Sequence, residues 1–240
     1  MNSGMALHGK LVWRMHMDLK VFIGWDSRED IAYQVARYSI LKYNPHVDVR
    51  PLKLYELREK GSYWRAGDKK ASTEFTISRF LVPFLSGYEG YSMFCDCDVL
   101  AMGDVQEIMR EVNTDEDRKP VWCVQHDYTP GSAMKMDGQM QHIYPRKNWS
   151  SVMVFDNELC TNLTPDLVNE ETPMFLHRMN WAGNGEEVGS LDSKWNSLAG
   201  YYDDPPSLIH YTDGGPWFEK YRDCPHARKW QDTLREMYGL

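Results

Sequence analysis

Three features that often define a protein's class are missing from this sequence. The chain carries 27 Lys and Arg against 35 Asp and Glu, a formal net charge of −8 at pH 7, so it has no excess of cations for a nucleic-acid backbone. No apolar run approaches the roughly 20 residues needed to cross a membrane, and no secretory signal is recognisable. We therefore expect no nucleic-acid partner and no integral membrane segment.

Cysteine is scarce and cannot be fully paired, because the chain contains five, at positions 95, 97, 123, 160 and 224. An odd number without a secretory signal favours a reducing compartment, so we expect a cytoplasmic location. Cys95 and Cys97 are one residue apart, but an isolated C-x-C pair is a weak metal signal. Packing is the favoured role, since free cysteine is mostly a small buried hydrophobe.

Strand-like and helix-like segments alternate from Leu19 onward. Residues 1–18 show no clean period and are interpreted as an N-terminal arm, whereas 19–240 are predicted to form a single α/β domain with one Rossmann-like mixed sheet flanked by helices. The expected strands are 19–24, 47–54, 91–100, 121–125, 148–155 and 206–211. The expected helices are 31–41, 72–84, 104–112, two within 164–179, and 226–240. Residues 127–144 are predicted to be a binding loop or lid.

The chain is organised around two carboxylates that follow an apolar run. Residues 91–95 are typical of a buried strand, and Asp96 and Asp98 come next with one residue between them. Side chains at i and i+2 of an extended segment point the same way, so both carboxylates should converge at the strand's carboxyl end, where α/β sheets bind ligands. Two charges so close need a proton or cation between them, and a hard divalent metal is the simplest solution.

Polar residues next to other predicted strands allow two interpretations each. Asp26 follows the first strand and is either a helix N-cap or a contact to a base or ribose. Arg79 lies off the apolar stripe of its helix and either reaches a phosphate or sugar or is solvated. Ser150 and Ser151 either let a ligand approach the backbone or simply lead into a strand.

His210 ends the last predicted strand, directly before a glycine-rich stretch at 212–217. Neutral imidazole is a common ligand for borderline divalent metals such as Mn²⁺, and backbone amides next to glycine can bind phosphate oxygens. Taken alone, His210 is more often a structural histidine.

Four stretches, in this order, resemble glycosyltransferase family 8, the glycogenin and lipopolysaccharide galactosyltransferase group. They are residues 19–26, Asp96-Cys97-Asp98, residues 148–152 and residues 210–217. A lone D-x-D motif arises easily by chance, but the ordered set is more specific, and it spans nearly the whole chain from residue 19. The resemblance implies a GT-A type nucleotide-diphospho-sugar transferase fold, with 19–125 as the nucleotide-binding half and 126–240 as the sugar and acceptor half.

The resemblance also implies a retaining, metal-dependent hexosyltransferase that uses a nucleotide sugar, commonly a UDP-sugar. By this likeness Asp96, Asp98 and His210 would hold Mn²⁺ or Mg²⁺ against the donor diphosphate. The acceptor would be a glycan, a lipid-linked molecule or a small molecule. The other residues implied to contact the donor are Gly24, Trp25, Asp26, Arg79, Cys97, Asn148, Ser150, Ser151, Gly214, Gly215 and Trp217.

The sequence departs from the family pattern at two places. Gly215 stands before Pro216 where many members carry Lys, so backbone amides must replace a cationic contact to the diphosphate. An Asp-Gln pair that family members place at the reacting face of the sugar is also missing. Glu186, Glu187 and Asp192 are the candidates for that catalytic position.

Two other functions agree with part of the sequence. Residues 94–100 also resemble the nucleophile motif of haloacid dehalogenase-type phosphatases, in which Asp96 would attack a phosphate ester. That motif normally follows the first strand, whereas two strand-like runs precede it here, and it leaves His210 unexplained. The third possibility is a non-catalytic protein that binds a nucleotide sugar.

Overall fold

The computed structural model describes residues 19–66, 72–112, 117–127, 146 and 148–240. Within them, six strands form one mixed sheet in the order β2-β1-β3-β6-β5-β7. The bounds are β1 (Lys20–Gly24), β2 (Asp48–Leu52), β3 (Tyr91–Cys95), β5 (Val121–Val124), β6 (Val152–Asp156) and β7 (Val188–Leu191). The expected N-terminal arm and nearly all of the expected 127–144 loop lie outside the described residues.

Only β6 runs against the direction of the other strands in this sheet. β1 is parallel to β2 and β3, β6 is antiparallel to both β3 and β5, and β5 is parallel to β7. The carboxyl ends of β1, β3, β5 and β7 therefore meet at one edge. The apolar run of β3 is buried at every position, as expected for a central strand covered on both faces.

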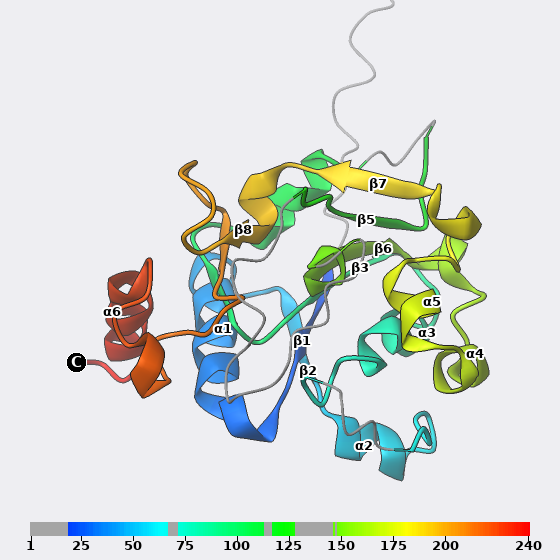
Figure 1. Ribbon diagram of the computed structural model, residues 1–240, viewed down its shortest axis with the longest axis horizontal. Helices are drawn as coiled ribbons and strands as arrows, with labels where there is room; N and C mark the ends of the chain where they lie inside the picture. Colours follow the sequence, from blue (N-terminus) through cyan, green and yellow to red (C-terminus); the bar gives the residue numbers. More distant parts are fainter. Residues whose placement is uncertain (1–18, 67–71, 113–116, 128–145, 147) are drawn as a thin grey trace, which may run out of the picture.

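Helices cover both faces of the sheet, as predicted. They are α1 (Asp30–Tyr43), α2 (Leu54–Glu59), α3 (Val82–Leu85), α4 (Pro165–Glu170), α5 (Pro173–His177) and α6 (Ala227–Met237). Figure 1 shows α1 and α6 on one side of the sheet and α3, α4 and α5 on the other. No helix in the described part of the chain is long and apolar enough to span a membrane.

A second, three-stranded sheet replaces part of the expected single sheet. It has the order β4-β9-β8, built from β4 (Val99–Ala101), β8 (Ser197–Leu198) and β9 (Leu208–His210). The predicted strand 91–100 thus splits at the Asp96-Cys97-Asp98 turn, because its two halves pair with different partners. The small sheet packs with α1 and α6 around a separate cluster that includes Val35, Leu100 and Trp230.

The predicted helix 72–84 is also interrupted. Turns at 74–77 lead into the 3₁₀ helix η2 (Ser78–Leu81), and only α3 is α-helical. Pro83 lies at the start of α3, where its missing N–H needs no intrahelical partner. The predicted helix 104–112 is likewise a 3₁₀ helix, η3 (Val105–Arg110). These short tight turns place Arg79 inside the molecule.

Phe155 tests the core of this sheet. It is fully buried on β6 and stacks against Trp181, with ring centroids 6.1 Å apart. Phe155→Ala should lower the free energy of unfolding by about 3–5 kcal/mol, because it removes buried surface and leaves a cavity. Urea denaturation measures this. Leu159→Ala, at an exposed position, should change stability by less than about 0.5 kcal/mol, and equal losses in both variants would contradict the placement.

Candidate metal and donor site

Asp96 and Asp98 lie on either side of a turn that links the two sheets. The Asp96 N–H donates to the Ser151 carbonyl at 2.9 Å, which extends the β3–β6 ladder by one residue, and the Tyr211 N–H donates to the Asp98 carbonyl at 2.9 Å. The strand itself ends at Cys95. The two carboxylates therefore converge across a turn. The expectation that alternation along a single strand brings them together is wrong, because the strand ends before Asp96.

His210 joins the two carboxylates because β9 pairs with β4, with His210 opposite Val99. One ligand atom from each of Asp96, Asp98 and His210 lies within 4.8 Å of the others. This is the only such group of three or more acidic, histidine or cysteine side chains within the described residues. The structure thus brings together the three side chains predicted as metal ligands.

The hydrogen bonds around His210 make Nδ1 the donor to Asn196 and leave Nε2 facing Asp98. His210 Nδ1 lies 2.8 Å from Asn196 Oδ1, and the Asn196 amide donates to the Asn148 carbonyl at 3.0 Å. Since the Asn196 amide nitrogen is already used as a donor, the Asn196 Oδ1 atom accepts a hydrogen bond from the Nδ1–H group of His210. In the neutral form of the ring, Nε2 then carries a lone pair. This Nε2 lies 3.4 Å from Asp98 Oδ1. Two acceptors at that separation need a cation or a proton between them.

Asn148 continues this network. Its side-chain amide donates to Thr212 Oγ1 at 3.0 Å, and its backbone adopts a left-handed conformation with φ of 63°. Buried polar groups are costly unless they are paired, so this chain of amides holds the imidazole in one orientation. The sequence predicted a contact for Asn148 but none for Asn196, which follows Trp195 and has no distinguishing motif around it.

Arg79 is buried, so the alternative that it is solvated is wrong. Its Nη1 lies 2.9 Å from Asp96 Oδ1 and donates to the Ser150 carbonyl at 2.8 Å. The guanidinium also lies 4.8 Å from the centre of the Phe94 ring. A fixed cation here offsets one of the two carboxylate charges, and the other remains for a bound cation.

The loop after β1 is held in place by hydrogen bonds to the Asp26 carboxylate. Asp26 is fully buried, caps the 3₁₀ helix η1 (Ser27–Glu29), and accepts hydrogen bonds from Arg28 and from the Glu74 N–H. Burial alone would raise the pKa of Asp26, but these bonds lower it below its usual value. The predicted N-cap is confirmed. A contact to a base or ribose remains a prediction.

The two other residues of this loop have different surroundings. At Gly24, a Cβ would lie 2.5 Å from the Phe75 ring, so glycine is needed for this packing. The Trp25 indole donates to Asp30 at 2.7 Å, and its ring makes an edge contact with Tyr55.

Ser150 and Ser151 are buried in the 3₁₀ helix η5 (Trp149–Ser151), immediately before β6. The Ser150 hydroxyl lies 2.9 Å from His177 Nδ1. Cys97 is buried in the core, and burial together with the nearby acidic groups raises the pKa of its thiol well above the usual range. Its surroundings are those of a packing residue, and its predicted donor contact remains untested.

The glycine-rich stretch folds back against its own aromatic residues. A Cβ on Gly214, whose φ is 131°, would lie 2.6 Å from the Tyr221 ring, and one on Gly215 would overlap the Trp217 ring. The Trp217 indole donates to Glu29 at 3.2 Å, which ties this stretch to the loop after β1. Both glycines are required for this close approach, whatever the backbone amides bind.

Glu29 is a buried acid that sequence reasoning missed, because an acid in the first turn of a helix is ordinarily solvated. It is 3% exposed. Burial, followed by the charges of Asp98 and Asp26, raises its pKa to about 8. Glu29 is therefore mostly protonated at pH 7 in the metal-free protein, because burial and the neighbouring carboxylates disfavour its ionisation.

His126 is a second missed residue, located just after β5. Its Nδ1 lies 2.8 Å from the Tyr202 hydroxyl, and its carbonyl accepts a hydrogen bond from the Trp149 indole. Burial, and then the electrostatic interaction with His210, lowers the pKa of His126 to about 3. The ring is therefore neutral at physiological pH and lies within electrostatic range of His210.

The three catalytic candidates do not lie together. Glu186 and Glu187 are exposed and precede β7, toward the end of the sheet opposite to Asp96 and Asp98, which follow the parallel strand β3. Asp192 follows β7 and thus lies at the carboxyl edge, exposed, where it caps the 3₁₀ helix η8 (Ser193–Asn196). This topology favours Asp192, but all three assignments remain predictions.

Glu29 predicts a pH dependence of stability in metal-free protein. Its folded pKa of about 8 lies above the usual 4.5, so the native state keeps a proton that the unfolded chain releases. Stability should therefore fall between about pH 4.5 and 8 relative to Glu29→Gln, by up to a few kcal/mol. Urea unfolding in EDTA at several pH values measures this, with Glu59→Gln as the exposed control. If the difference in free energy of unfolding between the wild type and Glu29→Gln did not change with pH, the burial of this carboxyl would be contradicted.

Solved glycosyltransferases share this arrangement of strands and helices. The apo WbbM bifunctional glycosyltransferase has a TM-score of 0.59 and 17% identity over 98% of this chain and 53% of its own. GlyE of Streptococcus pneumoniae TIGR4 has a TM-score of 0.58 and 14% identity over 93% of this chain and 64% of its own. The galactosyltransferase LgtC, solved with donor and acceptor sugar analogues, has a TM-score of 0.53 and 12% identity over 91% of this chain and 96% of its own. The chain thus spans about half of WbbM, and the predicted GT-A type fold is confirmed.

No protein-family model matches the sequence. Protein CDI of Arabidopsis thaliana is 44% identical over 227 residues, which cover 90% of this chain and 86% of the relative. The chain therefore belongs to the family of Protein CDI.

Proposed function

We propose that this chain is a metal-dependent glycosyltransferase of the family 8 type, which transfers a sugar from a UDP-sugar to an acceptor with retention. The observation that carries the proposal is the group formed by Asp96, Asp98 and His210. Its ligand atoms lie within 4.8 Å of one another, and the hydrogen bond to Asn196 leaves His210 Nε2 available. The proposal is also supported by the position of this group at the carboxyl edge of the parallel strands, where open α/β sheets bind their ligands.

The donor set fits a divalent cation. Two carboxylates and a neutral imidazole supply one nitrogen and several oxygen ligands, which suits Mn²⁺ better than Mg²⁺, an ion that prefers oxygen alone. When bound, the cation would stabilise negative charge on the departing nucleoside diphosphate. Asn196 orients His210, and Arg79 fixes Asp96. Asp96 then acts as a ligand and not as a nucleophile.

The rest of the donor site is assigned from position. The loop at Gly24, Trp25 and Asp26 would contact the base and ribose, and the backbone at Gly214 and Gly215 the diphosphate, next to Trp217. Asn148, Ser150 and Ser151 would border the sugar, and Asp192 is favoured over Glu186 and Glu187 for its reacting face. This assignment is supported by the hydrogen bond from the Trp217 indole to Glu29, which joins the glycine-rich stretch to the loop after β1. The Asp98 charge acts on Glu29, so this contact lies near the candidate metal ligands.

We also propose that residues 19–240 act as one GT-A domain, with a glycan, a lipid-linked molecule or a small molecule as acceptor. Strands of the large sheet come from both 19–125 and 126–240, so neither half could bury its sheet faces alone. The expectation of a cytoplasmic location is supported by the cysteines, which are all unpaired, four of them buried.

The phosphatase alternative is not favoured. Asp96 follows β3, the third strand in the chain, and its Oδ1 is held by Arg79 instead of being directed at an open phosphate site. The phosphatase reading also gives no role to the hydrogen-bonded chain from Thr212 through Asn148 and Asn196 to His210.

Release of UDP tests the proposed function. The protein incubated with a panel of UDP-sugars and Mn²⁺ should release UDP, slowly by hydrolysis without an acceptor and faster with one, and EDTA should abolish the release. Tight Mn²⁺-dependent UDP binding without turnover on any donor or acceptor would support the binding protein instead. Hydrolysis of a phosphate ester through an acyl phosphate trapped on Asp96 would establish the phosphatase.

Variants of the ligands test the metal site directly. Asp98→Asn should abolish metal-dependent UDP binding, and His210→Ala should weaken Mn²⁺ binding about tenfold or more, because each removes a ligand. Electron paramagnetic resonance of free Mn²⁺ and calorimetry with UDP measure these affinities. Asp48→Asn, an exposed residue paired with Arg50, is the matched control. Unchanged Mn²⁺ and UDP affinity in both ligand variants would overturn the assignment.

A further inference from the structure

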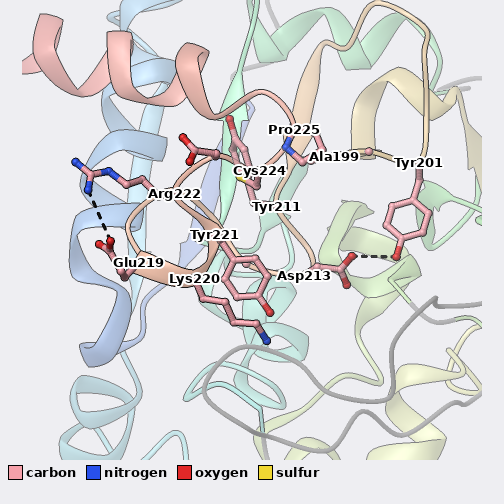
Figure 2. Close-up of a pocket in the computed structure, with 13 residues that line it drawn as sticks. Ala199, Tyr201, Tyr211, Asp213, Glu219, Lys220, Tyr221, Arg222, Cys224 and Pro225 are labelled. Carbon is pink, nitrogen blue, oxygen red and sulfur yellow. Dashed lines mark hydrogen bonds and ion pairs between the residues drawn. The ribbon is translucent and has the colours of Figure 1, made fainter.

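A cavity of about 530 Å³ lies beside the candidate donor site. Of its lining residues, only Gly214 is assigned above, through its backbone, to the donor. The cavity is formed by the loop after β8 (Ala199–Tyr201), the loop after β9 and the segment 219–225 that leads to α6. Figure 2 shows Tyr201 and Asp213 on one side of this pocket and Lys220 with Tyr221 on another. Its volume falls in the range of about 300–1,000 Å³ that is usual for small-molecule sites.

Two glycines shape the walls of the pocket. The Tyr221 ring packs directly on Gly214, where a Cβ would lie 2.6 Å from the ring. Gly200 has φ of 86°, and a Cβ there would lie 3.0 Å from Pro225. The Asp213 carboxylate is held by the Tyr201 hydroxyl, which donates to it at 2.9 Å. The pocket is therefore built from positioned groups, with an aromatic wall and a fixed carboxylate.

The charges of the pocket argue against an anionic ligand. Its lining contains the acidic residues Asp213, Glu219 and Asp223 and the basic residues Lys220 and Arg222, one more negative than positive. Arg222 also pairs with Glu219 at 3.7 Å, and the Lys220 ammonium lies 5.3 Å from the centre of the Tyr221 ring. A phosphate or diphosphate would meet no surplus of cations here.

The same groups suit a neutral sugar. A tyrosine ring offers a flat apolar surface to the C–H face of a pyranose, and its hydroxyl keeps a polar edge. Carboxylate oxygens accept hydrogen bonds and an ammonium donates them, and a sugar hydroxyl can do both. We propose that this pocket, with Tyr221 as its stacking surface and Asp213 and Lys220 as its polar contacts, binds a neutral sugar residue.

Tyr211 connects the pocket with the candidate metal ligands. Its backbone N–H donates to the Asp98 carbonyl at 2.9 Å, one residue after His210, and its side chain lines the pocket. The pocket thus borders the same β4–β9 segment that holds Asp98 and His210. We assign the bound sugar to the acceptor, and this assignment, unlike sugar binding itself, rests on the proposed function.

Saturation-transfer NMR and calorimetry in EDTA, without nucleotide, test the pocket. The probes are methyl glucoside, galactoside, mannoside and xyloside in both anomeric forms, with lactose and cellobiose. At least one should bind the wild-type protein, and Tyr221→Ala should weaken it about tenfold or more. Binding by none of the probes, equal binding by Tyr221→Ala, or displacement of the sugar by UDP would each overturn the proposal.

Matched variants separate the pocket from general effects on folding. Tyr238→Ala removes an exposed tyrosine at the end of α6 and should leave the affinity unchanged. Asp213→Asn keeps the size of the side chain but removes its charge, and should weaken binding several-fold without loss of secondary structure. Asp98→Asn should bind the sugar as well as the wild type, so failure of the proposed function and failure of the pocket give different results.

Modification of Cys224 provides a readout that needs no substitution. Cys224 lines the pocket and is partly exposed, whereas the other four cysteines are buried. A sugar at three times its dissociation constant occupies three quarters of the sites, so N-ethylmaleimide should modify Cys224 about fourfold more slowly. The rate at which N-ethylmaleimide modifies N-acetylcysteine in the same sugar solution shows whether the sugar itself affects the reagent. An unchanged rate at that occupancy would show that the sugar binds elsewhere and would overturn the proposal.

Discussion

The pairing of β4 with β9 is the contact on which the candidate site depends. It places Val99 opposite His210, so that a residue near the carboxyl terminus of the domain reaches the carboxylate next to β4. The approach of His210 Nε2 to Asp98 Oδ1 is unfavourable in the neutral form of the imidazole, since both atoms are then acceptors. Strand pairing, and the packing of the small sheet on α1 and α6, supply the free energy that holds the two groups together.

Hydrogen bonds determine which atoms of this site are available. The Asn196 side chain bonds both to His210 Nδ1 and to the Asn148 carbonyl, and the Asn148 side-chain amide donates to Thr212 Oγ1. The result is one imidazole tautomer and one ring orientation. Arg79 forms an ion pair with Asp96, and its guanidinium lies over the rings of Phe75 and Phe94. A site arranged in this way does not need to reorganise its ligands when a cation binds.

The electrostatic influence of this centre extends to the loop that follows β1. Glu29 and Asp26 lie on the loop that follows β1, and both influence the electrostatics near Asp98. Asp26 is stabilised by Arg28, whereas the Glu29 carboxyl has only the Trp217 indole as its donor among the described contacts, and its pKa rises accordingly. Because Trp217 belongs to the glycine-rich stretch, this single hydrogen bond joins the segments assigned to the base and to the diphosphate.

The local sequence was sufficient to predict every strand of the large sheet except β7, and the paired helices α4 and α5, since each follows from periodicity and turn chemistry. It offered the cap at Asp26 as one of two alternatives. It missed β7 because Val188–Leu191 is short and follows a polar, acidic stretch. It also identified Asp96, Asp98 and His210 as residues that could share a metal. It could not predict that the run 91–100 divides between two sheets, because both halves are apolar and only their pairing partners differ.

The burial of Arg79, the role of Asn196 and the raised pKa of Glu29 were decided by the tertiary structure alone. Each depends on groups more than ten residues away in the chain, and a side chain's charge state and hydrogen-bond partners are properties of its surroundings, which residue type and spacing do not specify. The sequence by itself thus determined which candidate ligands are present. The fold decided how they meet, because only long-range strand pairing brings positions 98 and 210 together.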